Sequence, residues 1–144
     1  MIKGFTDKIA DACKRNGISD LYAFGSRGAE IGAKVRGCAK VIPTKHASDV
    51  DIGALPSNLS QFGPLQRISL VIELEDLFDA PRVDLVVLPE ADPFLALEVI
   101  RGELLYTDDP DRQARHELYI LRRAGDLMPL KKERMRMILE EAAR

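Results

Sequence analysis

The chain has 144 residues, of which 46% are hydrophobic and 31% charged, a length and balance that suit one globular core and exclude a wholly disordered chain. Its formal charge of −2 gives no global reason to expect direct nucleic-acid binding. Two cysteines are too few for a disulfide framework, and no segment approaches the ~20 apolar residues of a membrane span or has the pattern of a signal peptide. We therefore expect a cytoplasmic protein without membrane contact.

The first part of the chain is predicted to alternate helix and strand. Apolar residues at helical spacing over 2–16 predict an amphipathic helix, and the short apolar run 18–24 predicts a buried strand. The Gly-Ser-Arg-Gly segment at 25–28 interrupts that strand. Residues 29–47 are rich in Gly, Ala and Lys, which favours an extended or mobile loop. The alternation of polar and apolar residues over 48–55 predicts a second strand.

The remaining segments predict further helices and strands around the same core. The apolar patterns predict a helix over 62–78, a strand over 83–88, a short helix over 93–101, a brief strand over 104–106, and two helices over 108–126 and 131–144 separated by Met128-Pro129. Helices that alternate with strands are typical of an α/β domain, here with a helical C-terminal extension.

A candidate phosphate-binding turn follows the first predicted strand. Gly25 allows backbone N–H groups to approach an anion closely, and Ser26 adds a hydroxyl donor. Arg27 could also contact phosphate, because its guanidinium suits phosphate oxygens, or it could be solvated or paired with an acid. A Gly-Ser pair by itself is more often an ordinary turn.

Two acidic residues share one face of the second predicted strand. Asp49 and Asp51 are two positions apart, so both carboxylates point to the same side, while Val50 and Ile52 point to the other. Neighbouring carboxylates repel each other without a cation, and carboxylate oxygens suit Mg²⁺. The alternative is an edge strand with an acidic, solvated face.

A third acid interrupts the apolar strand over 83–88. Asp84 requires a partner or a cation there, because burial of a lone carboxylate is costly. If this strand neighbours the one that carries Asp49 and Asp51, the three carboxylates could hold two metal ions, and Asp84 could accept a proton from an attacking hydroxyl. The alternative is a salt bridge from Asp84 to Arg82 or Arg101.

In this order, the Gly25-Ser26 turn, the Asp49-Val50-Asp51 strand and the later Asp84 resemble the DNA polymerase β superfamily of nucleotidyltransferases in its minimal form. The segments 102–112 and 119–127 are similar to the antitoxin branch of that family, the minimal nucleotidyltransferases paired with HEPN-domain ribonuclease toxins. The resemblance therefore extends over nearly the whole chain.

The resemblance implies a fold, an activity and a partner. It implies a palm-like mixed sheet with flanking helices over 1–106, and a C-terminal helical extension over 107–144 packed on the same domain. It implies transfer of AMP from ATP to a tyrosine of a HEPN toxin. Two Mg²⁺ ions would be held by Asp49, Asp51 and Asp84, and the triphosphate by Gly25, Ser26 and Arg27. The alternatives are an inactive antitoxin that neutralises its partner by binding only, and a transferase acting on a small molecule or RNA.

One departure from the family pattern concerns the connection between the turn and the acidic strand. The family usually places about a dozen residues between the Ser and the first Asp, whereas Ser26 and Asp49 are 23 positions apart (49 − 26). Because loops tolerate insertions at little entropic cost, we expect the segment 28–47 to fold out as a flap and to leave the site intact. The alternative is that it displaces the phosphate-binding turn.

Overall fold

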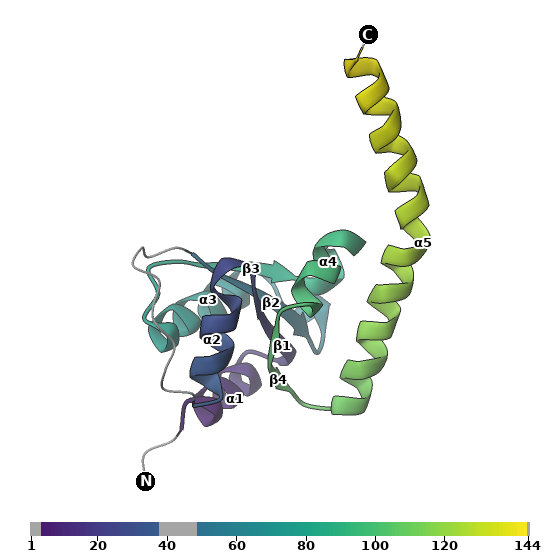
Figure 1. Cartoon of the computed structure of the whole chain (residues 1–144). Helices are drawn as coiled ribbons and strands as arrows, with labels where there is room; N and C mark the ends of the chain where they lie inside the picture. Colours follow the sequence, from purple (N-terminus) through teal and green to yellow (C-terminus); the bar gives the residue numbers. More distant parts are fainter. Residues whose placement is uncertain (1–3, 38–48, 144) are drawn as a thin grey trace.

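The computed structural model describes residues 4–37 and 49–143, which form a four-stranded sheet flanked by helices (Figure 1). The helices are α1 (Phe5–Arg15), α2 (Gly28–Val35), α3 (Pro64–Phe78), α4 (Pro93–Ile100) and α5 (Pro110–Ala142), and the strands are β1 (Ile18–Phe24), β2 (Val50–Pro56), β3 (Val83–Val87) and β4 (Glu103–Thr107). Short 3-10 turns follow β1 (η1, Gly25–Arg27), β2 (η2, Leu59–Gln61) and β3 (η3, Leu88–Glu90). The α/β class, and each strand within one or two residues of its predicted ends, are confirmed.

The sheet is mixed, as expected, with the strand order β3-β2-β1-β4. β1 is antiparallel to β2 and β4, whereas β2 and β3 are parallel. Helices α1, α2 and α3 cover one face over a core that includes Ile9, Ile52 and Leu74. Helix α4 and the first half of α5 cover part of the other face around Tyr22 and Val99.

The prediction of an extended loop after the Gly-Ser turn is wrong for its first part. Residues Gly28–Val35 form helix α2, which buries Ile31 and Val35 against the sheet. These two residues are four positions apart and therefore lie on one face of a helix. The flap expected over 28–47 has this helix as its first part, and its remainder over 38–47 lies outside the described residues.

The prediction of two C-terminal helices separated by Pro129 is also wrong, because α5 runs without interruption for 33 residues. Proline removes one N–H and crowds the carbonyl four residues earlier, which here belongs to Gly125. Gly125 is exposed, so water can satisfy that carbonyl, and the helix continues with a bend near its middle (Figure 1).

The two halves of α5 have different surroundings. The first half packs on the domain through Gln113, Ile120 and Ala124, whereas residues 129–143 are exposed and extend away from it (Figure 1). Despite its length α5 is strongly charged, and no helix in the described ranges has the length and apolar character to span a bilayer. The C-terminal half of α5 is therefore a surface element.

Candidate functional site

The three candidate carboxylates lie together at one end of the parallel strand pair. Asp51 of β2 is paired with Asp84 of β3, and residues paired in this way on parallel strands share one face of the sheet. Gly53 and Val86, the next pair on that face, lie against or near Val99 of α4. Asp49 precedes β2 by one residue. The acids thus face the side of the sheet that α4 covers only in part.

The Gly-Ser turn lies directly beside Asp51. Phe24, the last residue of β1, pairs with Asp51, and Gly25 then turns away with φ = +72°. A Cβ atom at Gly25 would collide with Oδ2 of Asp51. Glycine is therefore favoured here, on grounds of both backbone conformation and space. The turn and the carboxylate form one site.

The two residues after Gly25 differ in their surroundings. Ser26 is exposed in η1, and the N-terminus of α2 follows two residues later. Arg27 is instead partly buried, and its Nε donates to Oε2 of Glu30 at 3.0 Å. The turn therefore offers an exposed hydroxyl beside a helix N-terminus, which is a favourable position for phosphate oxygens. Of the possibilities considered for Arg27, pairing with an acid is the one found in this structure.

The acids influence one another electrostatically. The pKa of Asp51 is raised, first because its burial disfavours the charged form and then because the negative charges of Asp84 and Asp49 repel it. Like charges directly opposite each other on neighbouring strands are destabilising without a compensating cation. The site is therefore a place where a cation would be stabilising.

One cationic side chain already contacts two of the three acids. An Arg82 amino group lies 3.1 Å from Oδ1 of Asp84, and its Nε lies 3.8 Å from Oδ2 of Asp49. The expected alternative, a salt bridge between Arg82 and Asp84, is thus present. Over residues 4–37 and 49–143, no three His, Cys, Asp or Glu side chains are arranged to hold a metal ion. The donor chemistry suits a hard divalent cation, but the carboxylates are not gathered into a coordination shell.

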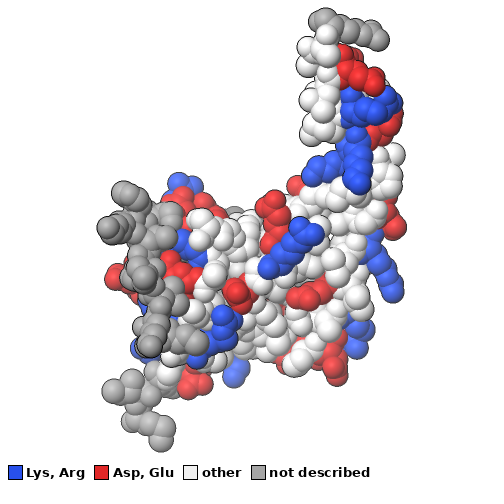
Figure 2. Space-filling view, in the orientation of Figure 1, with Lys and Arg blue, Asp and Glu red and all other residues white. Residues whose placement is uncertain are grey.

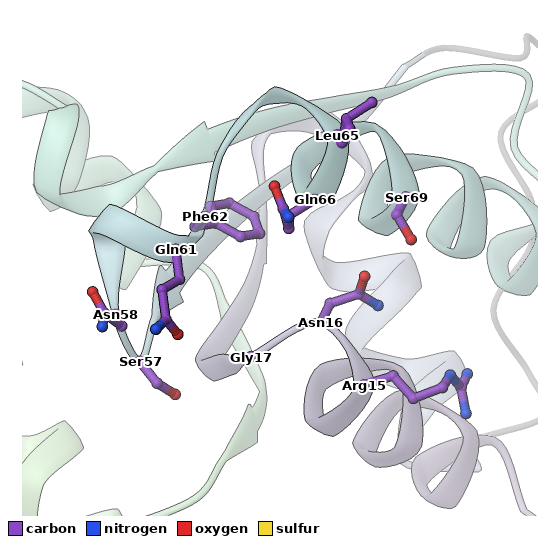
Figure 3. A pocket seen from close by; sticks show the side chains of 10 residues that line it. All are labelled: Arg15, Asn16, Gly17, Ser57, Asn58, Gln61, Phe62, Leu65, Gln66 and Ser69. Carbon is purple, nitrogen blue, oxygen red and sulfur yellow. The ribbon is translucent and has the colours of Figure 1, made fainter.

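A separate hollow lies at the opposite end of the sheet, where β1 begins and β2 ends (Figure 3). Its volume is about 460 Å³, and its lining is mostly polar and uncharged. Gly17 and Ser57 lie there, at the ends of β1 and β2 farthest from Gly25 and Asp51. The candidate phosphate turn and the carboxylates are not part of this hollow.

The Gly25→Ala variant tests the fit of the turn against Asp51. A Cβ at positive φ that also collides with a carboxylate is expected to destabilise the protein by about 1–3 kcal/mol. Urea unfolding measures this cost. Gly17→Ala is the matched control, since Gly17 also has a positive φ but no atom within 4 Å of the position that a Cβ would take. A loss in Gly25→Ala no larger than in Gly17→Ala would contradict the close contact with Asp51.

Comparison with known proteins assigns the chain to a family. The family model described as "Polymerase beta, Nucleotidyltransferase" matches residues 7–111, which is more than half of the chain. The chain belongs to this nucleotidyltransferase family. The match includes the turn at Gly25 and all three acids. No curated protein matches the chain.

Several solved structures share the whole fold of this family member. One is a mutant MntA toxin–antitoxin complex, with 22% identity, coverage of 96% of this chain and 98% of that chain, and a TM-score of 0.64. Another is a toxin–antitoxin complex with AMP-PNP (22% identity, 96% and 98% coverage, TM-score 0.61). A third contains a tri-AMPylated Shewanella oneidensis HEPN toxin with its MNT antitoxin (22% identity, 97% coverage of both chains, TM-score 0.60). At this identity the likeness shows the fold, and it extends through the long C-terminal helix.

Proposed function

We propose that the protein is a Mg²⁺-dependent nucleotidyltransferase that transfers AMP from ATP to a tyrosine hydroxyl of a HEPN-domain toxin and so acts as its antitoxin. The observation that carries the proposal is the single site formed by the Gly25 turn, Asp51 and Asp84 in a chain of the nucleotidyltransferase family. The solved complexes that share its fold include an AMPylated HEPN toxin and a bound ATP analogue.

Each residue has a specific role in this proposal. The backbone at Gly25 and the hydroxyl of Ser26 donate hydrogen bonds to the β- and γ-phosphate oxygens, and Arg27 adds positive charge beside them. Asp49, Asp51 and Asp84 supply the oxygen ligands for two Mg²⁺ ions. When bound, these ions would neutralise charge on the triphosphate and align the attacking and leaving oxygens.

The reaction is a displacement at the α-phosphorus. The acceptor oxygen forms a bond to the α-phosphorus, the bond to the bridging oxygen breaks, and pyrophosphate leaves. Asp84 accepts the proton of the attacking hydroxyl, since it is half-buried at the open end of the strand pair beside Asp51. The atoms of ATP and the hydroxyl are thereby all accounted for in AMP-protein and pyrophosphate.

The surface supports a protein as the acceptor. A groove of about 780 Å³ between α4 and α5 is lined by both apolar and charged residues; the apolar residues are Phe94, Leu95, Leu127, Leu130, Met135 and Ile138. The outer half of α5 shows uncharged atoms along one side and charged atoms along the other (Figure 2). Helices in proteins gain most of their stability from packing of an amphipathic face, and in this chain alone the outer half of α5 is exposed. A helix of a partner protein fits this groove.

A binding-only antitoxin is the second candidate. It is favoured by the absence, over the described residues, of a preformed group of metal-ligating side chains. The two candidates are separated by incubating the chain with labelled ATP, Mg²⁺ and the neighbouring HEPN protein. Label on a toxin tyrosine supports the transferase. Tight association of the two proteins without any labelled toxin supports an antitoxin that acts by binding alone.

The Ile138→Asp variant tests the α4–α5 groove as the toxin-binding surface. A carboxylate in an apolar interface is costly to desolvate, so the affinity for the toxin is expected to fall by at least about tenfold. Isothermal titration calorimetry measures this affinity. Because Ile138 is exposed in the free protein, its unfolding free energy is expected to change by less than about 0.5 kcal/mol.

Leu139→Asp is the matched control. Leu139 is also exposed on α5 but does not line the groove. We expect it to retain near wild-type affinity. Equal losses in both variants would place the interface elsewhere on the helix, and no loss in Ile138→Asp would exclude the groove.

A further inference from the structure

Arg82 is placed against the acids by the register of the parallel strands. Its carbonyl oxygen accepts a hydrogen bond from the N–H of Val50 at 3.0 Å, which fixes its backbone beside the start of β2. Val50 pairs with Val83, and Asp51 with Asp84. Arg82 immediately precedes Val83, the first paired residue of β3. It lies on the same face as Asp84, since side chains two positions apart on an extended chain share a face. The sheet thus holds one cation next to a group of three carboxylates.

The contacts of Arg82 use oxygens that a metal ion would need. Its guanidinium reaches both Asp84, which pairs with Asp51 across the sheet, and Asp49, which lies two positions before Asp51 in the chain. A divalent ion on these oxygens would lie within a few ångströms of the guanidinium, and two cations at that distance repel each other. The side chain of Arg82 is 67% exposed, so little packing opposes its movement into solvent.

We propose that Arg82 is an exchangeable counter-cation: it neutralises Asp49 and Asp84 when no metal is bound, and it is displaced when a divalent ion takes their oxygens. The inference rests on the proposed metal site. It explains why the three acids, although strand register places them near one another, do not form a coordination shell among the described residues. The guanidinium directs two of the three carboxylates toward itself. Metal binding therefore competes with the Arg82 contacts, and this competition lowers the apparent affinity for the free ion.

The Arg82→Gln variant tests the competition in the full-length chain without nucleotide. Mn²⁺ serves as the probe, and the free ion is measured by electron paramagnetic resonance. Removal of the competing charge is expected to tighten Mn²⁺ binding by about three- to tenfold. The rise in melting temperature on adding Mg²⁺ is expected to be larger in Arg82→Gln than in the wild type. Without metal, the variant lacks the guanidinium that contacts Asp49 and Asp84. Arg82→Lys, which keeps the charge, is expected to bind with an affinity between the two.

Arg67→Gln is the matched control, because Arg67 pairs with Glu90 away from the three acids. Its Mn²⁺ affinity is expected to equal that of the wild type. Unchanged or weaker Mn²⁺ binding in Arg82→Gln, with clear binding in the wild type, would overturn the exchange but leave the metal site standing. Absence of Mn²⁺ binding in every variant would overturn both the exchange and the metal site of the proposed function.

Discussion

Replacement of Asp51 by asparagine is expected to reduce AMP transfer to the toxin by about a thousandfold, the loss of roughly 4 kcal/mol of transition-state stabilisation. Asp51 is the carboxylate closest to the phosphate turn, since its Oδ2 occupies the space that a side chain at Gly25 would need. An amide of the same shape keeps the packing but removes a charged metal ligand. Initial rates with labelled ATP and Mg²⁺ measure the loss.

The same variant reports on the charge repulsion in the site. The pKa of Asp51 is raised in the folded protein, so the folded state binds its proton more tightly than the unfolded chain does. The wild type therefore loses stability as the pH rises from the pKa of Asp51 in the unfolded chain through its higher pKa in the folded protein. The loss is complete once the pH is above the pKa of the folded protein. Asp51→Asn has no such dependence. At neutral pH and without metal it should be at least as stable as the wild type in urea.

Asp76→Asn is the control for the transfer experiment. Asp76 is an exposed acid on α3, outside the site, and the variant is expected to keep the wild-type rate. Undiminished transfer by Asp51→Asn would contradict the proposed role of this carboxylate. An inactive Asp51→Asn that still binds the toxin would show that neutralisation by binding and transfer are separate properties.

The sequence predicted the strands, and the shared face of Asp49 and Asp51, because these features depend on local patterns. Alternation over 48–55 determines which side chains share a face, and the parallel pairing of β2 with β3 then brings Asp51 beside Asp84. The close approach of Gly25 to Asp51 follows from the antiparallel pairing of Phe24. Neither pairing is encoded in a single segment, and the sequence left the neighbourhood of the two acidic strands as a condition.

The features that the sequence did not predict depend on tertiary contacts. Helix α2 contains two glycines and has a weak intrinsic preference for helix, yet burial of Ile31 and Val35 on the sheet stabilises it. The continuity of α5 through Pro129 depends on an exposed carbonyl that water can satisfy. The sequence left Arg82 and Arg101 as possible salt-bridge partners of Asp84. The register of the strands places Arg82 there. Each outcome is decided by what surrounds the segment.

The attachment of α5 to the domain depends on an ion pair that the sequence analysis did not predict. Asp20 of β1 is fully buried, and Arg112 donates to both of its carboxylate oxygens, at 3.0 Å and 2.6 Å. Replacement of Arg112 by methionine would leave the Asp20 charge buried without its partner. We expect the free energy of unfolding to fall by about 3 kcal/mol, measured by urea denaturation.

Two further variants distinguish the buried pair from the exposed contact beside it. Arg112 also lies 3.0 Å from Asp108, but that acid is largely exposed, so Asp108→Ala is expected to cost less than about 1 kcal/mol. Adding Asp20→Asn to Arg112→Met removes the uncompensated charge and should recover part of the loss, which gives a coupling energy for the pair. If Arg112→Met costs no more than Asp108→Ala, the pair with Asp20 does not anchor the helix. In that case the orientation of α5, and of the groove it forms with α4, must depend on the apolar contacts of Ile120 and Ala124.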